Sequence, residues 1–229
     1  MAILFFDRLV EKSWHNRFLF VLIAILSFLI LNPLLNNFFR ISVLLDIFLT
    51  IVFVASIYAV SHKRHHLIIG ILLLLPLLLT TWTKHLVQSP VLTVIGLCSG
   101  ILFFAFMVVT ILSFVFKQNT VTLNVINAAV VVYLLMAMMW ALLYTLLEIL
   151  APGSFALTES GPQESAFHFF YYSFVTITTL GYGDITPASE IARSIAVVEA
   201  VIGQIYLVVL VARLVGIHIA QTVSEGKEV

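Results

Sequence analysis

Long runs of hydrophobic residues, separated by short polar segments, make up most of the chain of 229 residues. A helix needs roughly 20 predominantly apolar residues to cross the hydrocarbon core of a bilayer. Runs of about this length predict six membrane-spanning helices, at residues 18–35, 41–60, 67–82, 91–116, 123–150 and 191–219. The pattern therefore predicts an all-α integral membrane protein with six transmembrane helices.

The segment between the fifth and sixth predicted spans has a different pattern. Residues 151–165 are polar and rich in turn-forming residues, whereas residues 166–178 are apolar but too short to span a bilayer. The sequence TLGYGDITP then interrupts any helix with its two glycines and its proline. Irregular backbone at membrane depth is tolerated only inside protein or beside water. We therefore expect a re-entrant pore helix followed by a loop that lines a pore.

Composition agrees with a membrane protein and excludes several functions. Hydrophobic residues make up 62% of the chain and charged residues 10%, whereas soluble proteins carry roughly 25% charged residues. The formal net charge is zero, which argues against nucleic acid as a partner. With Cys98 as the single cysteine, no intrachain disulfide can form. The sequence contains no nucleotide-binding motif or catalytic triad pattern, so we expect neither an enzyme nor a cofactor.

The basic residues predict the orientation of the chain. If the N-terminus is cytoplasmic, most lysines and arginines lie on or near the inner side, as the positive-inside rule requires. These are Arg8, Lys12, Arg17, Lys63, Arg64, Lys117, Arg213 and Lys227. Only Arg40, Lys84 and Arg193 lie near the outer side. We expect a multi-pass protein of the cell membrane with both termini in the cytoplasm and the pore loop on the outer face.

The loop sequence TITTLGYGD has the features that a dehydrated potassium ion requires. Successive backbone carbonyls can replace the water of the ion if they point toward one axis. Gly181 and Gly183 can adopt the positive φ angles that this arrangement needs. Thr179 can offer both its carbonyl and its hydroxyl, while Leu180 and Tyr182 are expected to point away from the axis and wedge the loop.

This segment resembles the signature of tetrameric potassium channels, whose filter reads Thr-Val-Gly-Tyr-Gly. The resemblance covers about residues 124–216, and Leu180 in place of valine is a mild departure that leaves the carbonyls in place. It implies passive conduction of potassium, the permeant ligand, through a filter of residues 179–183. One loop supplies one quarter of a carbonyl ring, so the resemblance also implies a homotetramer in the lipid bilayer.

The same resemblance assigns residues that support the filter. Asp184 follows the filter, as in the family, where this acid is tied to an aromatic donor on the pore helix. By spacing, the matching residue is Tyr171, beside Tyr172, and Thr178 precedes the filter directly. We predict a hydrogen bond from the Tyr171 hydroxyl to Asp184.

The sixth helix carries a candidate gate. Gly203 lies twenty residues after Gly183, and this spacing resembles that of the hinge glycine of the family. Alternatively, Gly203 is a packing glycine, since glycine is common where membrane helices meet. Gln204, Leu207 and Val211 share one face of the helix and could line the cavity below the filter.

Two acids inside predicted spans are possible modulators, because an intramembrane acid is a functional candidate by default. Asp46 could instead lie beside a wet, outward-facing crevice, paired with Lys84, His85 or an asparagine. Glu199 could hydrogen-bond the back of the pore helix or act on conduction through its charge.

The first four helices resemble a voltage-sensor domain in number and topology only. Residues 90–116 contain no Lys, Arg, Asp, Glu or His, so the fourth helix gains nothing from the membrane field and we predict no steep voltage dependence. The loop SHKRHH, residues 61–66, could sense pH or bind a metal, or could anchor the chain beside lipid headgroups.

The expected organisation has four parts. An amphipathic segment (1–17) precedes a four-helix domain (18–116), a pore domain (117–219) and a short cytoplasmic tail (220–229), with no soluble ligand-binding domain. The predicted function is that of a potassium-selective channel subunit. The alternatives are a less selective cation channel, if Leu180 loosens the filter, and a regulatory subunit of a hetero-oligomeric channel. A secondary transporter would predict inverted repeats, which the sequence lacks.

Overall fold

The computed structural model describes residues 17–39, 42–60, 64–83, 89–157 and 167–225. Within them, helices occupy all six ranges predicted to span the membrane, and a shorter helix occupies the predicted pore-helix range. The helices are α2 (Arg17–Phe39), α3 (Ser42–Val60), α4 (Arg64–Thr83), α5 (Pro90–Lys117), α6 (Leu123–Leu150), α7 (Phe167–Ile177) and α8 (Glu190–Glu225). Residues 1–16 of the predicted amphipathic segment (1–17) lie outside the described residues.

Length and hydropathy support membrane insertion. Among the described residues, α4, α5, α6 and α8 are each long and apolar enough to cross a membrane, while α2 and α3 contribute shorter apolar stretches. The final helix continues to Glu225, so most of the tail predicted at residues 220–229 is an extension of α8. The protein is therefore all-α, apart from one small pair of strands.

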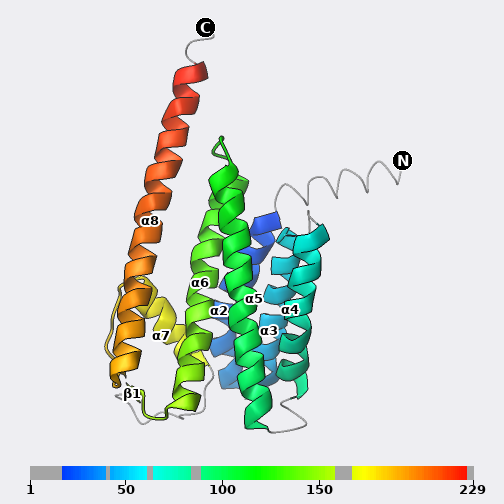
Figure 1. Ribbon diagram of the computed structural model, residues 1–229, viewed down its shortest axis with the longest axis vertical. Coiled ribbons are helices and arrows are strands. Elements are labelled where there is room, and N and C mark those ends of the chain that lie inside the picture. The colour runs from blue at the N-terminus through cyan, green and yellow to red at the C-terminus, as the bar shows by residue number, and fades with distance from the viewer. Residues whose placement is uncertain (1–16, 40–41, 61–63, 84–88, 158–166, 226–229) are drawn as a thin grey trace, which may run out of the picture.

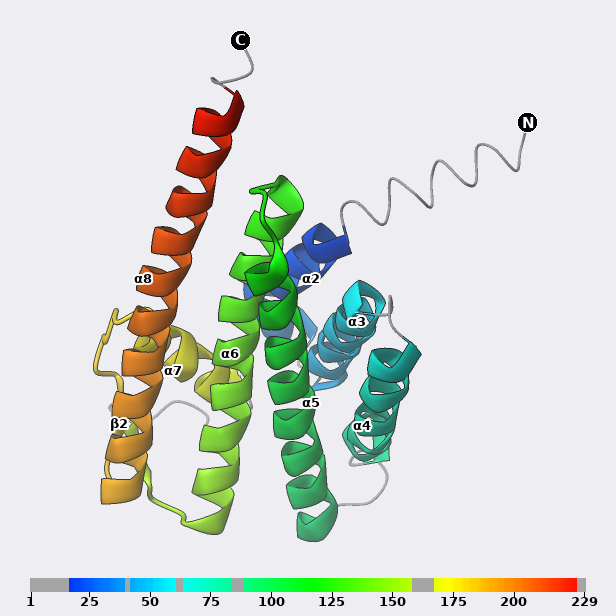
Figure 2. The same ribbon diagram turned by 45° about the horizontal axis from the view of Figure 1, so that its top comes forward.

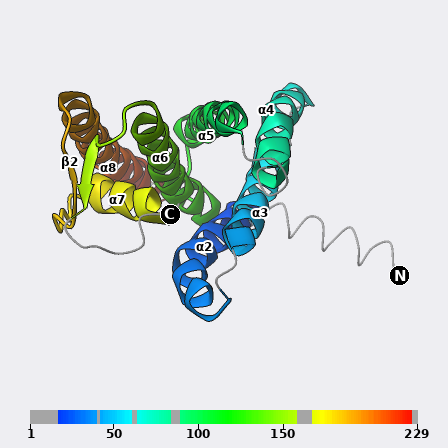
Figure 3. The same cartoon turned by 90° about the horizontal axis from the view of Figure 1, so that it is seen from below.

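Helix α6 lies at the centre of the molecule (Figures 1 and 2). It packs against α5 and α2 on one side and against α7 and α8 on the other. Seen along the long axis, α2 to α5 form one group of helices, and α7 and α8 lie beyond α6 (Figure 3). We call the end with the C-terminus of α6 and the N-terminus of α8 the filter end, and the opposite end, with the α5–α6 connection, the tail end.

Two glycines allow α5 to approach its neighbours closely. A Cβ atom added at Gly96 would lie 2.5 Å from the Thr80 hydroxyl on α4. A Cβ atom added at Gly100 would lie 2.6 Å from a Leu142 methyl on α6. Small residues four apart let membrane helices approach closely enough for extensive van der Waals contact. Gly96 therefore brings α5 close to α4, and Gly100 brings α5 close to α6.

A two-stranded antiparallel ladder closes the filter end. Strand β1 (Phe155–Leu157) pairs with β2 (Ile185–Pro187), with Ala156 opposite Thr186. The Ser154 carbonyl accepts hydrogen bonds from two further amides, at Ala188 and Ser189. The ladder joins the segment after α6 to the segment after residues 179–183. The chain between β1 and β2, which contains α7 and the filter loop, is therefore closed at its two ends by the ladder.

Candidate ion pathway

The backbone of the filter loop alternates in conformation. Thr179, Gly181 and Gly183 have positive φ angles of 59°, 58° and 80°, whereas Leu180 and Tyr182 do not. Alternation of this kind turns successive carbonyl groups toward the same side of the chain, as a ring of ion-coordinating carbonyls requires. Positive φ was expected at the two glycines. It was not expected at Thr179, because β-branched residues rarely adopt this conformation.

The strained conformation of Thr179 ends the pore helix. Its amide donates to the Thr176 carbonyl (2.9 Å), and the amide of Leu180 donates to the Val175 carbonyl (2.9 Å). This is the pattern of a Schellman cap, in which the residue after the helix is left-handed and usually glycine. The cap and the first filter residue therefore coincide, so the C-terminus of α7, where the helix dipole is negative, lies directly at the filter.

Tyr171 and Asp184 form the predicted hydrogen bond across the filter. The Tyr171 hydroxyl donates to Asp184 Oδ2 (2.6 Å), and the Ile185 amide donates to Asp184 Oδ1 (3.0 Å). The bond from Tyr171 holds the pKa of Asp184 below its ordinary value, although desolvation works in the opposite direction. The same bond raises the pKa of Tyr171 to about 12. The carboxylate thus links the pore helix to the strand that follows the filter.

The other two predicted support residues stabilise α7. Tyr172 is buried, and its ring contacts the rings of Tyr144 (5.0 Å) and Phe155 (5.3 Å) edge to face, a favoured geometry for aromatic pairs. The Thr178 hydroxyl donates to the Phe174 carbonyl (2.6 Å). Tyr172 therefore fixes the pore helix to α6 and β1, while Thr178 satisfies a carbonyl at the end of the helix.

Leu180 and Tyr182 were expected to point away from the axis and wedge the loop, but among the described residues of one chain they have little to pack against. Their side chains are 54% and 67% exposed. A Cβ atom added at Gly181 or Gly183 would meet no other atom within 4 Å. The filter loop is therefore fixed by its backbone, by α7 and by Asp184, while its side chains have an open surface beside them.

A buried carboxyl group joins three helices behind the filter. Glu199 on α8 is fully buried and accepts a hydrogen bond from the Tyr144 hydroxyl on α6. The Ser173 hydroxyl on α7 lies 2.5 Å from Glu199 Oε1 and 2.7 Å from the Ala137 carbonyl oxygen on α6. Of the two roles considered for Glu199, this arrangement matches the hydrogen bond to the back of the pore helix.

The candidate gate residues differ in their surroundings. A Cβ atom added at Gly203 would lie 2.8 Å from the Ile177 carbonyl oxygen and 2.7 Å from the Ile177 side chain, so Gly203 packs directly against the end of α7. This contact favours the packing interpretation of the glycine. Gln204 and Val211 are exposed and Leu207 is half-buried, so these side chains have room to face a neighbouring subunit or a cavity.

Asp46 lies apart from the filter. It is fully buried and lines a cavity of about 180 Å³ with Thr80, Gly96 and other residues of α3 to α7. Its backbone carbonyl accepts a hydrogen bond from the Thr50 hydroxyl (2.7 Å). The predicted partners Lys84 and His85 lie outside the described residues.

Glu148 has a structural role that sequence reasoning missed. Its carboxylate accepts the amide of Gly153 (2.8 Å) and the amide of Phe155 (3.1 Å). The carboxylate therefore holds the turn that leads from α6 into β1. The run Ala-Pro-Gly-Ser after the helix indicates a turn, but nothing in it indicates which acid satisfies its amides.

Comparison with known proteins identifies one part of the chain. Residues 120–218 match the model of a protein family described as an ion channel. This match covers less than half of the chain and includes α6, α7, the filter loop and most of α8. The chain therefore contains an ion-channel pore domain, which is a domain of transport proteins rather than of enzymes. Neither curated proteins nor solved structures give a match.

Proposed function

We propose that the chain is the subunit of a potassium-selective channel. The observation that carries this proposal is the alternating backbone of Thr179, Gly181 and Gly183, which follows a short helix at membrane depth. A potassium ion is coordinated by carbonyl oxygens that replace its hydration shell. The backbone conformation supplies successive carbonyls on one side of the loop, and the neighbouring hydrogen bonds hold them there.

Four copies of the chain surround the pore in this proposal. One loop gives carbonyls from one direction only, so a closed ring requires several copies related by rotation. The exposed apolar surface supports this assembly, because Leu180, Tyr182 and one side of α8, including Val197, Val201 and Val208, are uncovered in the single chain. In a fourfold assembly, neighbouring filters and inner helices would cover much of this surface.

The orientation proposed places the tail end in the cytoplasm. Of the described lysines and arginines, Arg17, Arg64, Lys117 and Arg213 lie toward the tail end, whereas Arg193 lies at the filter end. Positive residues are enriched on the cytoplasmic side of membrane proteins. The filter then faces the outside, and ions leaving the filter inward enter a cavity lined by α8.

Ion flux from vesicles tests the proposal with a matched pair of variants. Gly183 and Gly153 both have positive φ angles, 80° and 83°, and a Cβ atom added at either would meet no other atom within 4 Å. Glycine to alanine should therefore impose a similar backbone strain at both positions. We expect Gly183→Ala to abolish or strongly reduce potassium flux, because it distorts the filter, and Gly153→Ala to leave selectivity unchanged. Equal potassium flux and selectivity in both variants would contradict a carbonyl filter at this loop.

A further inference from the structure

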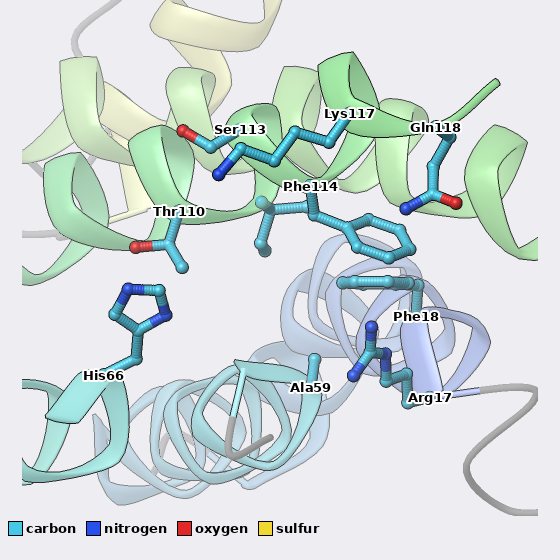
Figure 4. Close-up of a pocket in the computed structure, with 10 residues that line it drawn as sticks. Arg17, Phe18, Ala59, His66, Thr110, Ser113, Phe114, Lys117 and Gln118 are labelled. Atoms are coloured by element: carbon cyan, nitrogen blue, oxygen red, sulfur yellow. The ribbon is translucent and has the colours of Figure 1, made fainter. Parts of the chain in front are cut away.

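A cationic pocket opens at the tail end of the four-helix group (Figure 4). It has a volume of about 170 Å³ and lies between the start of α2, the end of α3, the start of α4 and the end of α5. Its lining includes Arg17, His66 and Lys117, together with the hydroxyls of Thr110 and Ser113. None of the described residues that line it is acidic. Within the described part of the chain, the pocket therefore combines cationic groups and hydroxyl groups without a competing carboxylate.

Arg17 is fixed in this pocket by aromatic rings. Its guanidinium carbon lies 4.9 Å from the centre of the Phe18 ring and 5.0 Å from that of Phe114. The two rings also contact each other, with centroids 5.2 Å apart. Aromatic contacts orient the guanidinium group while leaving its N–H donors available. One of these donors, Nε, is buried and has no hydrogen-bond partner among the described residues.

This set of groups fits a phosphate. A guanidinium group binds phosphate through paired N–H donors, and an ammonium group adds a point charge. A buried N–H without a partner costs free energy, which a bound acceptor recovers. The pocket also lies at the end of the membrane-spanning helices, where the head groups of an anionic phospholipid would be located.

The pocket is connected to the end of α8. Lys117 and Gln118 line it, and the Arg213 guanidinium on α8 donates to the carbonyls of Phe116 (2.5 Å) and Gln118 (3.1 Å). The Val121 amide donates to Gln221 Oε1 on α8 (3.2 Å). The segment 116–121 is therefore shared between the pocket on one side and the pore-lining helix on the other.

We infer that this pocket binds a phosphate-bearing anion through Arg17 and Lys117, and that its occupancy stabilises the segment 116–121 against α8. The bound group is the phosphate of an anionic lipid or of a soluble phosphorylated compound, which present the same chemistry to the pocket. This assigns a ligand site to the four-helix group, whose fourth helix carries no charged residue before Lys117 at its end. Neither binding nor its effect on the segment depends on which ion the pore conducts.

Native mass spectrometry of the purified full-length chain tests whether the bound group belongs to an anionic lipid. We expect phosphatidylglycerol to be retained over phosphatidylcholine, and Arg17→Gln or Lys117→Gln to weaken retention by about tenfold to a hundredfold, the loss of a charge-assisted hydrogen bond. Arg64→Gln is the matched control, because Arg64 is an exposed arginine at the same end that does not line the pocket. Arg17→Lys keeps the charge but loses the paired donors, so its retention should be intermediate.

Thermal unfolding in neutral detergent tests whether the bound group belongs to a soluble phosphorylated compound. If inorganic phosphate or glycerol phosphate raises the Tm of the wild type over chloride of equal ionic strength, and not that of Arg17→Gln, the soluble source is supported. The Tm measured without ligand shows whether each variant is folded. If Arg17→Gln does not fold, Arg17→Lys is used in its place. Retention and Tm shifts that are the same in the wild type and both pocket variants would overturn the binding site.

Hydrogen–deuterium exchange tests the connection to α8. We expect the bound anion to slow exchange of the backbone amides of the segment 116–121 in the wild type and in Arg64→Gln, but not in Lys117→Gln. Binding without any change in exchange at this segment would overturn the connection. Because this readout does not require ion flux, its failure is distinct from a failure of the proposed channel function.

Discussion

Replacing Glu199 should reveal how the buried hydrogen-bond chain supports the filter. Each hydroxyl has one proton, yet Ser173 Oγ lies within hydrogen-bond distance of both the Ala137 carbonyl and Glu199. All three contacts contain a proton if Glu199 is protonated and donates to Ser173, Ser173 donates to Ala137, and Tyr144 donates to Glu199, whereas an ionised Glu199 leaves one of the two contacts of Ser173 without a proton. The arrangement therefore favours a neutral carboxyl group, which also avoids placing an unpaired charge inside the membrane.

The expected loss in the free energy of unfolding follows from the groups that each substitution removes. Glu199→Ala leaves the buried Tyr144 hydroxyl without its acceptor, at about 1–3 kcal/mol. It also leaves a cavity where Cγ and the carboxyl group were, so we expect a total loss of about 2–4 kcal/mol. Glu199→Gln has nearly the same shape, and its amide can donate to Ser173 and accept from Tyr144. We expect this variant to lose less than about 1 kcal/mol.

Thermal unfolding followed by tryptophan fluorescence in detergent measures both effects. At about 2–4 °C per kcal/mol for a chain of this size, Glu199→Ala should lower Tm by about 4–16 °C and Glu199→Gln by less than about 4 °C. Glu190→Ala is the control, because Glu190 is an exposed acid on the same helix, and its Tm should match the wild type. An unchanged Tm in Glu199→Ala would refute a stabilising role, and equal losses in the alanine and glutamine variants would refute the neutral hydrogen-bond chain.

Four further predictions concern the filter, its acid sensitivity, the inner helix and voltage. Tyr171→Phe removes the hydrogen bond that stabilises the Asp184 carboxylate, so current should decay faster during maintained conduction; unchanged decay would show that the bond does not brace the filter. Because the pKa of Asp184 is lowered by this bond, the bond is present at neutral pH and is lost as pH falls through that lowered pKa. Conduction of the wild type should therefore fall in this acidic range, whereas Tyr171→Phe, which lacks the bond at every pH, should not show this acid-sensitive step. Gly203→Ala would force α8 away from the Ile177 carbonyl, so Tm and channel assembly should fall, and wild-type values of both would contradict a packing role. A voltage ramp should show no steep activation, since α5 lacks charged residues before Lys117, whereas a gating charge of several elementary units would disprove this.

The spanning helices and the pore helix were predictable because single physical signals define them. Apolar runs of the length of a bilayer mark the helices, and the glycines and proline after Ile177 end the short one. The hydrogen bond between Tyr171 and Asp184 followed from the resemblance to potassium channels. The structure contains that bond, and it places Glu199 against the pore helix, one of the two roles that the sequence left open.

Features that depend on tertiary packing could not be predicted. The left-handed backbone at Thr179 runs against the preference of a β-branched residue, and only the cap of α7 and the filter together impose it. Strands β1 and β2 are three residues each, too short for an alternating pattern to be recognised. The cationic pocket draws on the ends of four helices, and no spacing along the chain brings Arg17, His66 and Lys117 together.

The central claim is that the loop of residues 179–183 selects potassium. The most direct test is the reversal potential of the purified protein in a planar bilayer, with potassium on one side and sodium on the other. A reversal close to the potassium equilibrium potential is the predicted result. Clear current that reverses near zero would contradict the claim, and would show that the pore with Leu180 in its filter does not discriminate between the two ions.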